Sequence, residues 1–135
     1  MKIINPDDYV EILENSYCDS NISVPLFTTG FADIITWEES KYVVIVNYRK
    51  TETHIHPLNF NRFLTFYDSS KIYMDFLDSN QYNNAIQLLG KLEYDECFGY
   101  VPLLAFGGSE KVENLQKIKL LPHIDIMAQA SGRIE

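Results

Sequence analysis

The stretch from residue 24 to residue 56 constrains the fold more than any other part of the sequence. It holds four runs rich in Val, Ile, Thr and aromatic residues, separated by short polar or glycine-containing breaks. Such residues favour β-strands. The breaks are too short for crossover helices, so neighbouring strands must be antiparallel. The sequence therefore predicts an antiparallel meander over residues 24–29, 31–37, 41–48 and 52–56.

Helical patterns flank this meander. Asn5 and Pro6 form a helix-start signal, because asparagine caps helices and proline suits the first helical position. An apolar stripe then continues to Tyr17. After the meander, apolar residues recur at helical spacing, which predicts three short helices. They span about residues 60–67, 71–77 and 80–89. Gly90 is expected to end the third helix, because glycine readily adopts the left-handed conformation that follows a helix.

The C-terminal part predicts a β-hairpin followed by a helix. Residues 98–106 and 114–120 have strand-like composition, and the loop between them contains two adjacent glycines. Pro102 falls inside the first of these strands, so it marks an edge or a bulge. Pro122 starts the last helix. The fold class expected for residues 1–135 is a single α+β domain, an antiparallel β-sheet meander packed by several short helices.

Composition sets outer bounds on this protein. With 135 residues, 46% of them hydrophobic, the chain can bury a sizeable core. No apolar run approaches the roughly 20 residues that cross a bilayer, and the N-terminus lacks the apolar run of a secretory signal. We therefore expect a cytoplasmic protein with no membrane contact. Cys18 and Cys97 lie far apart and form no C-x-x-C motif, so reduced thiols are expected.

The charge balance is acidic. Nineteen acidic against eleven basic side chains give a formal net charge of −8, and no Lys/Arg cluster is present. Direct nucleic-acid binding is therefore not expected, because phosphates are gathered by clustered basic residues. An acidic surface instead favours a basic protein partner. Moderate acidity also serves ordinary solubility, so charge alone does not identify a function.

Motifs for catalysis or cofactor binding are weak. Cys97 follows Asp95 and Glu96, an acidic setting that disfavours a thiolate nucleophile. His54 and His56 lie on one face of a predicted strand, which is half of a metal site and is also common on exposed strands. The Gly-Gly pair precedes no helix, so it indicates a hairpin turn and not a phosphate loop. We expect no catalytic residue, no metal and no cofactor.

The block from residue 95 to residue 123, DECFGYVPLLAFGGSEKVENLQKIKLLPH, carries a family resemblance. It resembles the C-terminal signature of type VI secretion immunity proteins that protect bacteria against a DNase effector. The N-terminal Asn-Pro-Asp-Asp-Tyr and the strand ending at Trp37 resemble earlier parts of the same domain. The matching residues of the closing block are Asp95, Glu96, Cys97, Gly99, Pro102, Gly107, Gly108, Asn114, Leu115, Lys117 and Lys119.

Two departures from the family pattern stand out. Ala32 occupies the place where the family usually has glycine before Asp33, which puts a tight turn there in question. The GAD-like helical domain that precedes this domain in many relatives is not found in the sequence, so any toxin contact made by that domain would be missing. The layout also resembles the broader Smi1/Knr4-like immunity superfamily, whose α+β scaffolds bind diverse toxins.

The resemblance implies a non-enzymatic immunity protein that binds a cognate secreted toxin, a basic nuclease effector, and neutralises it by stoichiometric occlusion. The alternative is a non-enzymatic adaptor or regulatory module on the same scaffold, and a toxin gene beside this one would favour immunity. The candidate toxin-binding residues lie in turns at sheet ends, where binding residues often occur. Trp37 is also a candidate core residue. The candidate set is Asp33, Trp37, Glu38, Glu39, Asp95 and Glu96.

Overall fold

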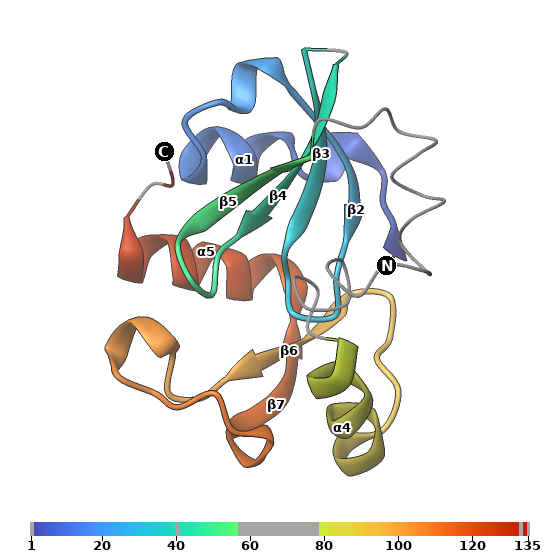
Figure 1. Ribbon diagram of the computed structural model, residues 1–135, viewed down its shortest axis with the longest axis vertical. Coiled ribbons are helices and arrows are strands. Elements are labelled where there is room, and N and C mark those ends of the chain that lie inside the picture. Colours follow the sequence, from blue (N-terminus) through green and yellow to red (C-terminus); the bar gives the residue numbers. More distant parts are fainter. Residues whose placement is uncertain (1, 40, 57–78, 133, 135) are drawn as a thin grey trace.

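The computed structural model describes residues 2–39, 41–56, 79–132 and 134, and its main element is a five-stranded antiparallel sheet (Figure 1). Strands β2 to β5 follow the chain order, as expected for a meander with short connections. Strand β1 was not predicted; it pairs with β2 across a longer connection that contains α1. The predicted α+β class is confirmed. The strands are β1 (Lys2–Ile3), β2 (Ser23–Thr28), β3 (Ile34–Glu38), β4 (Tyr42–Asn47) and β5 (Glu52–His56).

The connection between β2 and β3 is longer than predicted. The strand expected from residue 31 begins at Ile34, because the five residues before it form a turn closed by a bond from Thr29 N to the Asp33 carbonyl, 3.0 Å. Ala32 has φ of +67°, the left-handed region that usually requires glycine. The tight turn therefore forms with alanine, and not glycine, at the position before Asp33. The Ala32 methyl group is fully buried, and this burial offsets part of the backbone strain.

Two helices pack side by side on one face of the sheet (Figure 1). They are α1 (Val10–Ser16), preceded by the 3-10 turn η1 (Pro6–Asp8), and α5 (Leu120–Ser131). The Asn5 side chain accepts a hydrogen bond from Asp7 N, so it caps η1 as a helix-start residue should. The α-helix itself begins later than predicted, at Val10. Alternate residues of the central strands contact these helices. The core includes Leu13, Ile34, Val44, Val46, Ile124 and Met127.

A second, smaller unit lies below the sheet in Figure 1. It contains α4 (Ser79–Leu89) and the two-stranded antiparallel sheet of β6 (Glu96–Tyr100) and β7 (Leu115–Lys119). Gly90, with φ of +86°, ends α4 as predicted. The first two of the three predicted middle helices lie outside the described residues. Short 3-10 turns complete the chain: η2 (Ser20–Ile22), η3 (Leu104–Phe106) and η4 (Val112–Asn114).

Both prolines in the C-terminal part lie differently from prediction. The strand expected to reach residue 106 ends at Tyr100, so Pro102 lies in the following turn and not in a strand. The last helix begins at Leu120 and not at Pro122. Pro122 is the third residue of this helix, where its missing N–H costs no hydrogen bond within the helix.

The two units share an aromatic core. Phe31, from the β2–β3 turn, packs against Phe98 and Tyr100 of β6 and against Tyr82 of α4. The backbone joins at the same place, because Phe98 N donates to the Gly30 carbonyl at 2.7 Å. The β2–β3 turn therefore connects the meander to the smaller unit.

Replacing Thr51 by Gly is expected to stabilise the fold by about 0.5–1 kcal/mol. Thr51 is exposed in the β4–β5 turn at φ of +54°, a strained conformation for a β-branched residue. Glycine relieves that strain at a smaller cost in chain entropy. The measurement is the urea midpoint. Thr51→Ala is the control and should raise the midpoint less than Thr51→Gly, because alanine loses the β-branch but keeps the left-handed strain of a Cβ atom. Equal gains in both variants would contradict the explanation.

Candidate functional site

The structure does not bring the six predicted site residues together. Asp33 precedes β3 and Glu38 ends it, so the length of the strand, roughly 16 Å, separates them. Asp33 therefore lies at the opposite end of β3 from Trp37, Glu38 and Glu39, so these candidates do not share one turn. Asp95 and Glu96 lie elsewhere, at the start of β6.

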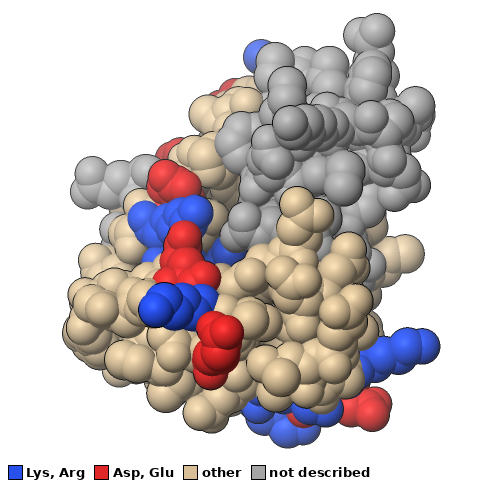
Figure 2. Space-filling model, turned by 60° about the horizontal axis from the view of Figure 1, so that its bottom comes forward, with Lys and Arg blue, Asp and Glu red and all other residues tan. Residues whose placement is uncertain are grey.

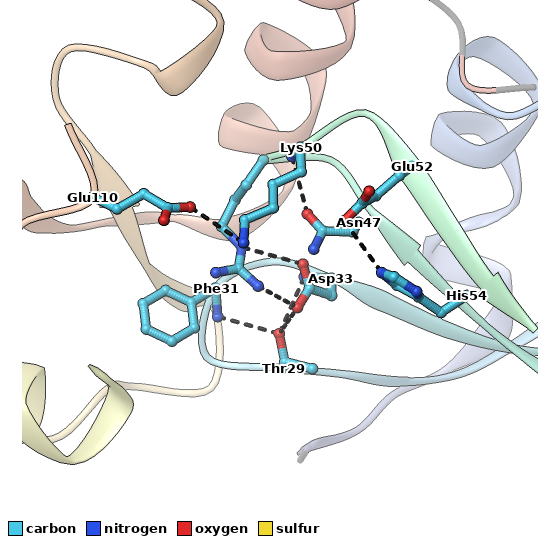
Figure 3. A network of polar contacts seen from close by, with 9 residues as sticks. Thr29, Phe31, Asp33, Asn47, Lys50, Glu52, His54 and Glu110 are labelled. Carbon is cyan, nitrogen blue, oxygen red and sulfur yellow. Dashed lines mark hydrogen bonds and ion pairs between the residues drawn. The ribbon is translucent and has the colours of Figure 1, made fainter. Parts of the chain in front are cut away.

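Asp33 is the centre of a buried polar network (Figure 3). Its side chain is fully buried and accepts hydrogen bonds from Thr29 Oγ1 at 3.0 Å and from Arg49 Nη2 at 2.9 Å. Arg49 is itself buried, and its guanidinium carbon lies 4.6 Å from the centre of the Phe31 ring. Burial takes the Asp33 carboxylate away from any partner surface, so its role here is structural.

Glu38 is also buried, with 2% of its surface exposed. Tyr17 Oη donates to both carboxylate oxygens, at 3.0 and 3.1 Å, and Thr36 Oγ1 donates at 2.6 Å. Burial and the neighbouring Glu38 carboxylate raise the pKa of Tyr17, so its hydroxyl stays protonated as a donor. Glu38 thus connects Tyr17, at the end of α1, to β3. Because its carboxylate is buried like that of Asp33, Glu38 does not face a partner, contrary to the prediction.

Trp37 and Glu39 retain access to solvent. Trp37 is half-buried, and Glu39 is exposed at the β3–β4 turn, where Tyr42 Oη donates to its carboxylate at 3.2 Å. The aromatic ring is therefore neither a fully buried core residue nor a fully exposed anchor. These two residues keep a small mixed surface at this end of the sheet.

Asp95 and Glu96 have different roles although they are adjacent. Asp95 is exposed, and its carboxylate lies 2.7 Å from Lys119 Nζ, which raises the pKa of that lysine. Glu96 is half-buried and accepts a hydrogen bond from the backbone N of Glu93 at 2.9 Å. Glu96 therefore stabilises the turn before β6, and Asp95 keeps its carboxylate at the surface.

The cysteine and histidine weighed as a nucleophile and a metal ligand lie in ordinary packing and surface contacts. Cys97 is fully buried in the main core, and neither it nor Cys18 forms a disulfide. His54 Nε2 lies 3.2 Å from the Glu52 carboxylate (Figure 3). Within residues 2–39, 41–56, 79–132 and 134, no three His, Cys, Asp or Glu side chains converge as metal ligands. None of the helices described there is long and apolar enough to span a membrane.

Charge on the lower end of the molecule is mixed. Acidic and basic side chains alternate in a row on this face (Figure 2). One pair at the surface joins the two units: Lys50 Nζ of the β4–β5 turn lies 3.3 Å from Glu110 Oε1. Interspersed charges of this kind provide solubility and do not form a single-sign field for a charged partner.

A groove between α1 and α5 was not predicted from the sequence. It has two adjoining hollows of about 340 and 420 Å³, which share Asp8, Leu121 and Pro122. We call these hollows together the helix groove. The first is also lined by Tyr9, Tyr94, Asp95, Lys119 and Leu120, and the second by Glu11, Ile12, Asn15 and Asp125. The sequence signal was the spacing of Glu11 and Asn15, which places them on one face of α1.

These features define an α+β protein in which two predicted site acids serve the fold and an exposed acidic groove lies between two helices. Comparison with known protein families matches residues 58–131 to the family described as T6SS immunity protein Tdi1, C-terminal, where T6SS is the type VI secretion system. The match spans more than half of the chain, and the chain belongs to this family. The resemblance found in the sequence is confirmed; the wider link to the Smi1/Knr4-like superfamily stays a prediction.

A solved structure shares the fold. The "Crystal structure of Atu4351 from Agrobacterium tumefaciens" matches with a TM-score of 0.70 at 18% sequence identity. The match covers 96% of this chain and 66% of that chain, so this chain spans just under two thirds of that protein. An identity this low shows the fold alone. A search of curated proteins finds no match.

Proposed function

We propose that this protein is an immunity protein that binds a cognate T6SS toxin one-to-one and neutralises it by occlusion, without catalysis of its own. The observation that carries the proposal is the family match over residues 58–131. The structure is compatible with a binding role, because its exposed acids and the helix groove offer a surface for another protein. Cys97, the thiol considered as a nucleophile, is fully buried.

The proposed toxin is a basic nuclease. Enzymes that grip DNA gather Lys and Arg around the phosphates, and this chain carries the opposite charge, −8. An acidic partner that covers such a face blocks DNA entry without chemistry. Of the residues predicted from the sequence, Trp37, Glu39, Asp95 and Glu96 remain candidates for contact, since they are not fully buried.

The direct test is co-expression with a T6SS toxin whose gene lies beside the gene of this chain. Cells that produce the toxin should survive only when this chain is also produced, and the two purified proteins should form a one-to-one complex. An adaptor would leave the cells unprotected. Failure of the folded protein to protect, or to bind the toxin, would overturn the proposed function.

Association with the toxin is expected to depend on salt. Exposed charges are screened beyond roughly 8 Å at physiological ionic strength, so steering between an acidic and a basic protein weakens as salt is added. The association rate should therefore be several-fold higher at low ionic strength, while the dissociation rate changes less. Stopped-flow fluorescence gives both rates. A salt-independent association rate would remove the electrostatic part of the proposal and leave the immunity role standing.

A further inference from the structure

The helix groove follows from how α1 and α5 pack. The two helices lie side by side in Figure 1, and their inner residues, including Leu13 and Ile124, are buried against the sheet. Between them, two hollows open to solvent, one beside η1 and the start of α5 and the other beside α1 and α5. The shared residues Asp8, Leu121 and Pro122 make the hollows continuous. Hollows of this size can receive several side chains of a partner.

The floor of the helix groove is apolar. Tyr9 and Leu120 are buried core residues that also line it, and Ile12 and Leu121 pack partly against the same core. Tyr94 forms part of the wall, with 61% of its surface exposed, and its hydroxyl donates to the Ile3 carbonyl at 3.1 Å. A partner that enters the groove therefore meets apolar and aromatic surface, which favours apolar side chains.

The lining of the helix groove is strongly acidic. Four carboxylates line it, from Asp8, Glu11, Asp95 and Asp125, against the single ammonium of Lys119. Lys119 forms an ion pair with Asp95, with Nζ 2.7 Å from the carboxylate. The Asp125 carboxylate accepts a hydrogen bond from the neutral Gln129 side chain. Asp8 and Glu11 also suit the positive end of α1, but a helix end does not account for Asp125, which lies in the middle of α5.

We infer that the helix groove is the docking site for a cationic amphipathic segment of the toxin. This inference rests on the proposed function and adds the surface and the chemistry of the contact. Lys or Arg side chains of the segment pair with Asp8, Glu11 and Asp125, and its apolar side chains cover the floor. A polyanion such as DNA does not fit, because the groove acids repel phosphates.

Charge reversal inside the groove tests the inference. The variant Glu11→Lys/Asp125→Lys should raise the Kd for the purified toxin by more than tenfold, because like charges then face the cationic segment. The control variant Asp19→Lys/Glu113→Lys makes the same change in net charge at exposed positions outside the groove. It should raise the Kd by no more than a few-fold, through long-range steering alone. Thermal melting of each variant shows whether the fold is preserved.

A gain in affinity gives a second, independent readout. Lys119→Gln removes the only cation among the groove residues and exposes Asp95 to the partner. It should lower the Kd several-fold. If the double reversal unfolds the protein, the neutral variant Glu11→Gln/Asp125→Asn replaces it and should still weaken binding measurably.

The outcomes separate the docking site from the function. Equal Kd values for the groove reversal and its control would overturn the groove as the docking site, while wild-type binding and protection would keep the proposed function intact. The variant Glu39→Lys tests the other exposed surface. If Glu39→Lys abolishes binding and the groove variant binds normally, the contact lies at the β3–β4 turn and the inference is wrong. Absence of binding by the wild-type protein would instead overturn the proposed function itself.

Discussion

Replacing Asp33 by Asn is expected to destabilise the fold by about 3 kcal/mol or more, because breaking a buried ion pair leaves the remaining charge uncompensated. Arg49 would keep its buried guanidinium against Phe31 and lose the carboxylate that now lies 2.9 Å away. The asparagine has nearly the same shape, so the effect reports on charge and not on packing. The measurement is the free energy of unfolding from urea denaturation.

The partner variant separates charge from packing. Asp33→Asn/Arg49→Met removes both buried charges and is expected to be more stable than Asp33→Asn alone. The matched surface control is Glu110→Gln, which breaks the ion pair with Lys50 on half-exposed side chains and should change the urea midpoint very little. If Asp33→Asn lowers the free energy of unfolding as little as Glu110→Gln does, the Asp33–Arg49 pair does not stabilise the contact between the β2–β3 and β4–β5 turns.

Replacing Phe31 by Ala is expected to cost about 3–5 kcal/mol, the usual range for emptying a buried aromatic site. The Phe31 ring is 1% exposed and lies within 6.5 Å, centre to centre, of three other aromatic rings. One of them, Tyr100, is stacked with an interplanar angle of 5°. The substitution also removes the ring face that covers the Arg49 guanidinium.

The loss should not be uniform along the chain. Phe31 joins the meander to the unit of α4, β6 and β7, so hydrogen exchange in Phe31→Ala should accelerate more in that unit than in β3 and β4. Phe31→Leu is the control and should lose less, because it keeps most of the apolar volume. If hydrogen exchange in Phe31→Ala accelerates equally in both units, Phe31 does not specifically connect them.

Local elements were predictable because neighbouring residues determine them. The helical turn η1 followed from Asn5-Pro6, whose cap needs only the next two residues, although α1 itself starts at Val10. β5 has the predicted bounds, and α4 ends at Gly90 as expected. Boundaries failed where a turn interrupted an apolar run. The run that starts at Phe31 is apolar because Phe31 enters a core, and not because it is part of a strand.

The family was also recognisable from sequence order, since the block from residue 95 to residue 123 lies entirely within the matched region. The roles of individual acidic residues could not be predicted from the sequence. Asp33 and Glu39 look equally available in the sequence, but Asp33 is fully buried beside Arg49, which is also buried and donates a hydrogen bond to it. Whether a carboxylate faces solvent depends on residues that approach it from elsewhere in the chain.

By itself, the sequence determined most of the described helices and strands, the antiparallel order of β2 to β5 and the acidic charge, because these depend on local spacing and composition. Only the tertiary structure decided which acids are buried and where a partner can dock. The helix groove exists because α1 and α5, more than 100 residues apart in the chain, pack side by side on one sheet face. No local pattern specifies that pairing, since it arises when both helices bury their apolar stripes against the same strands.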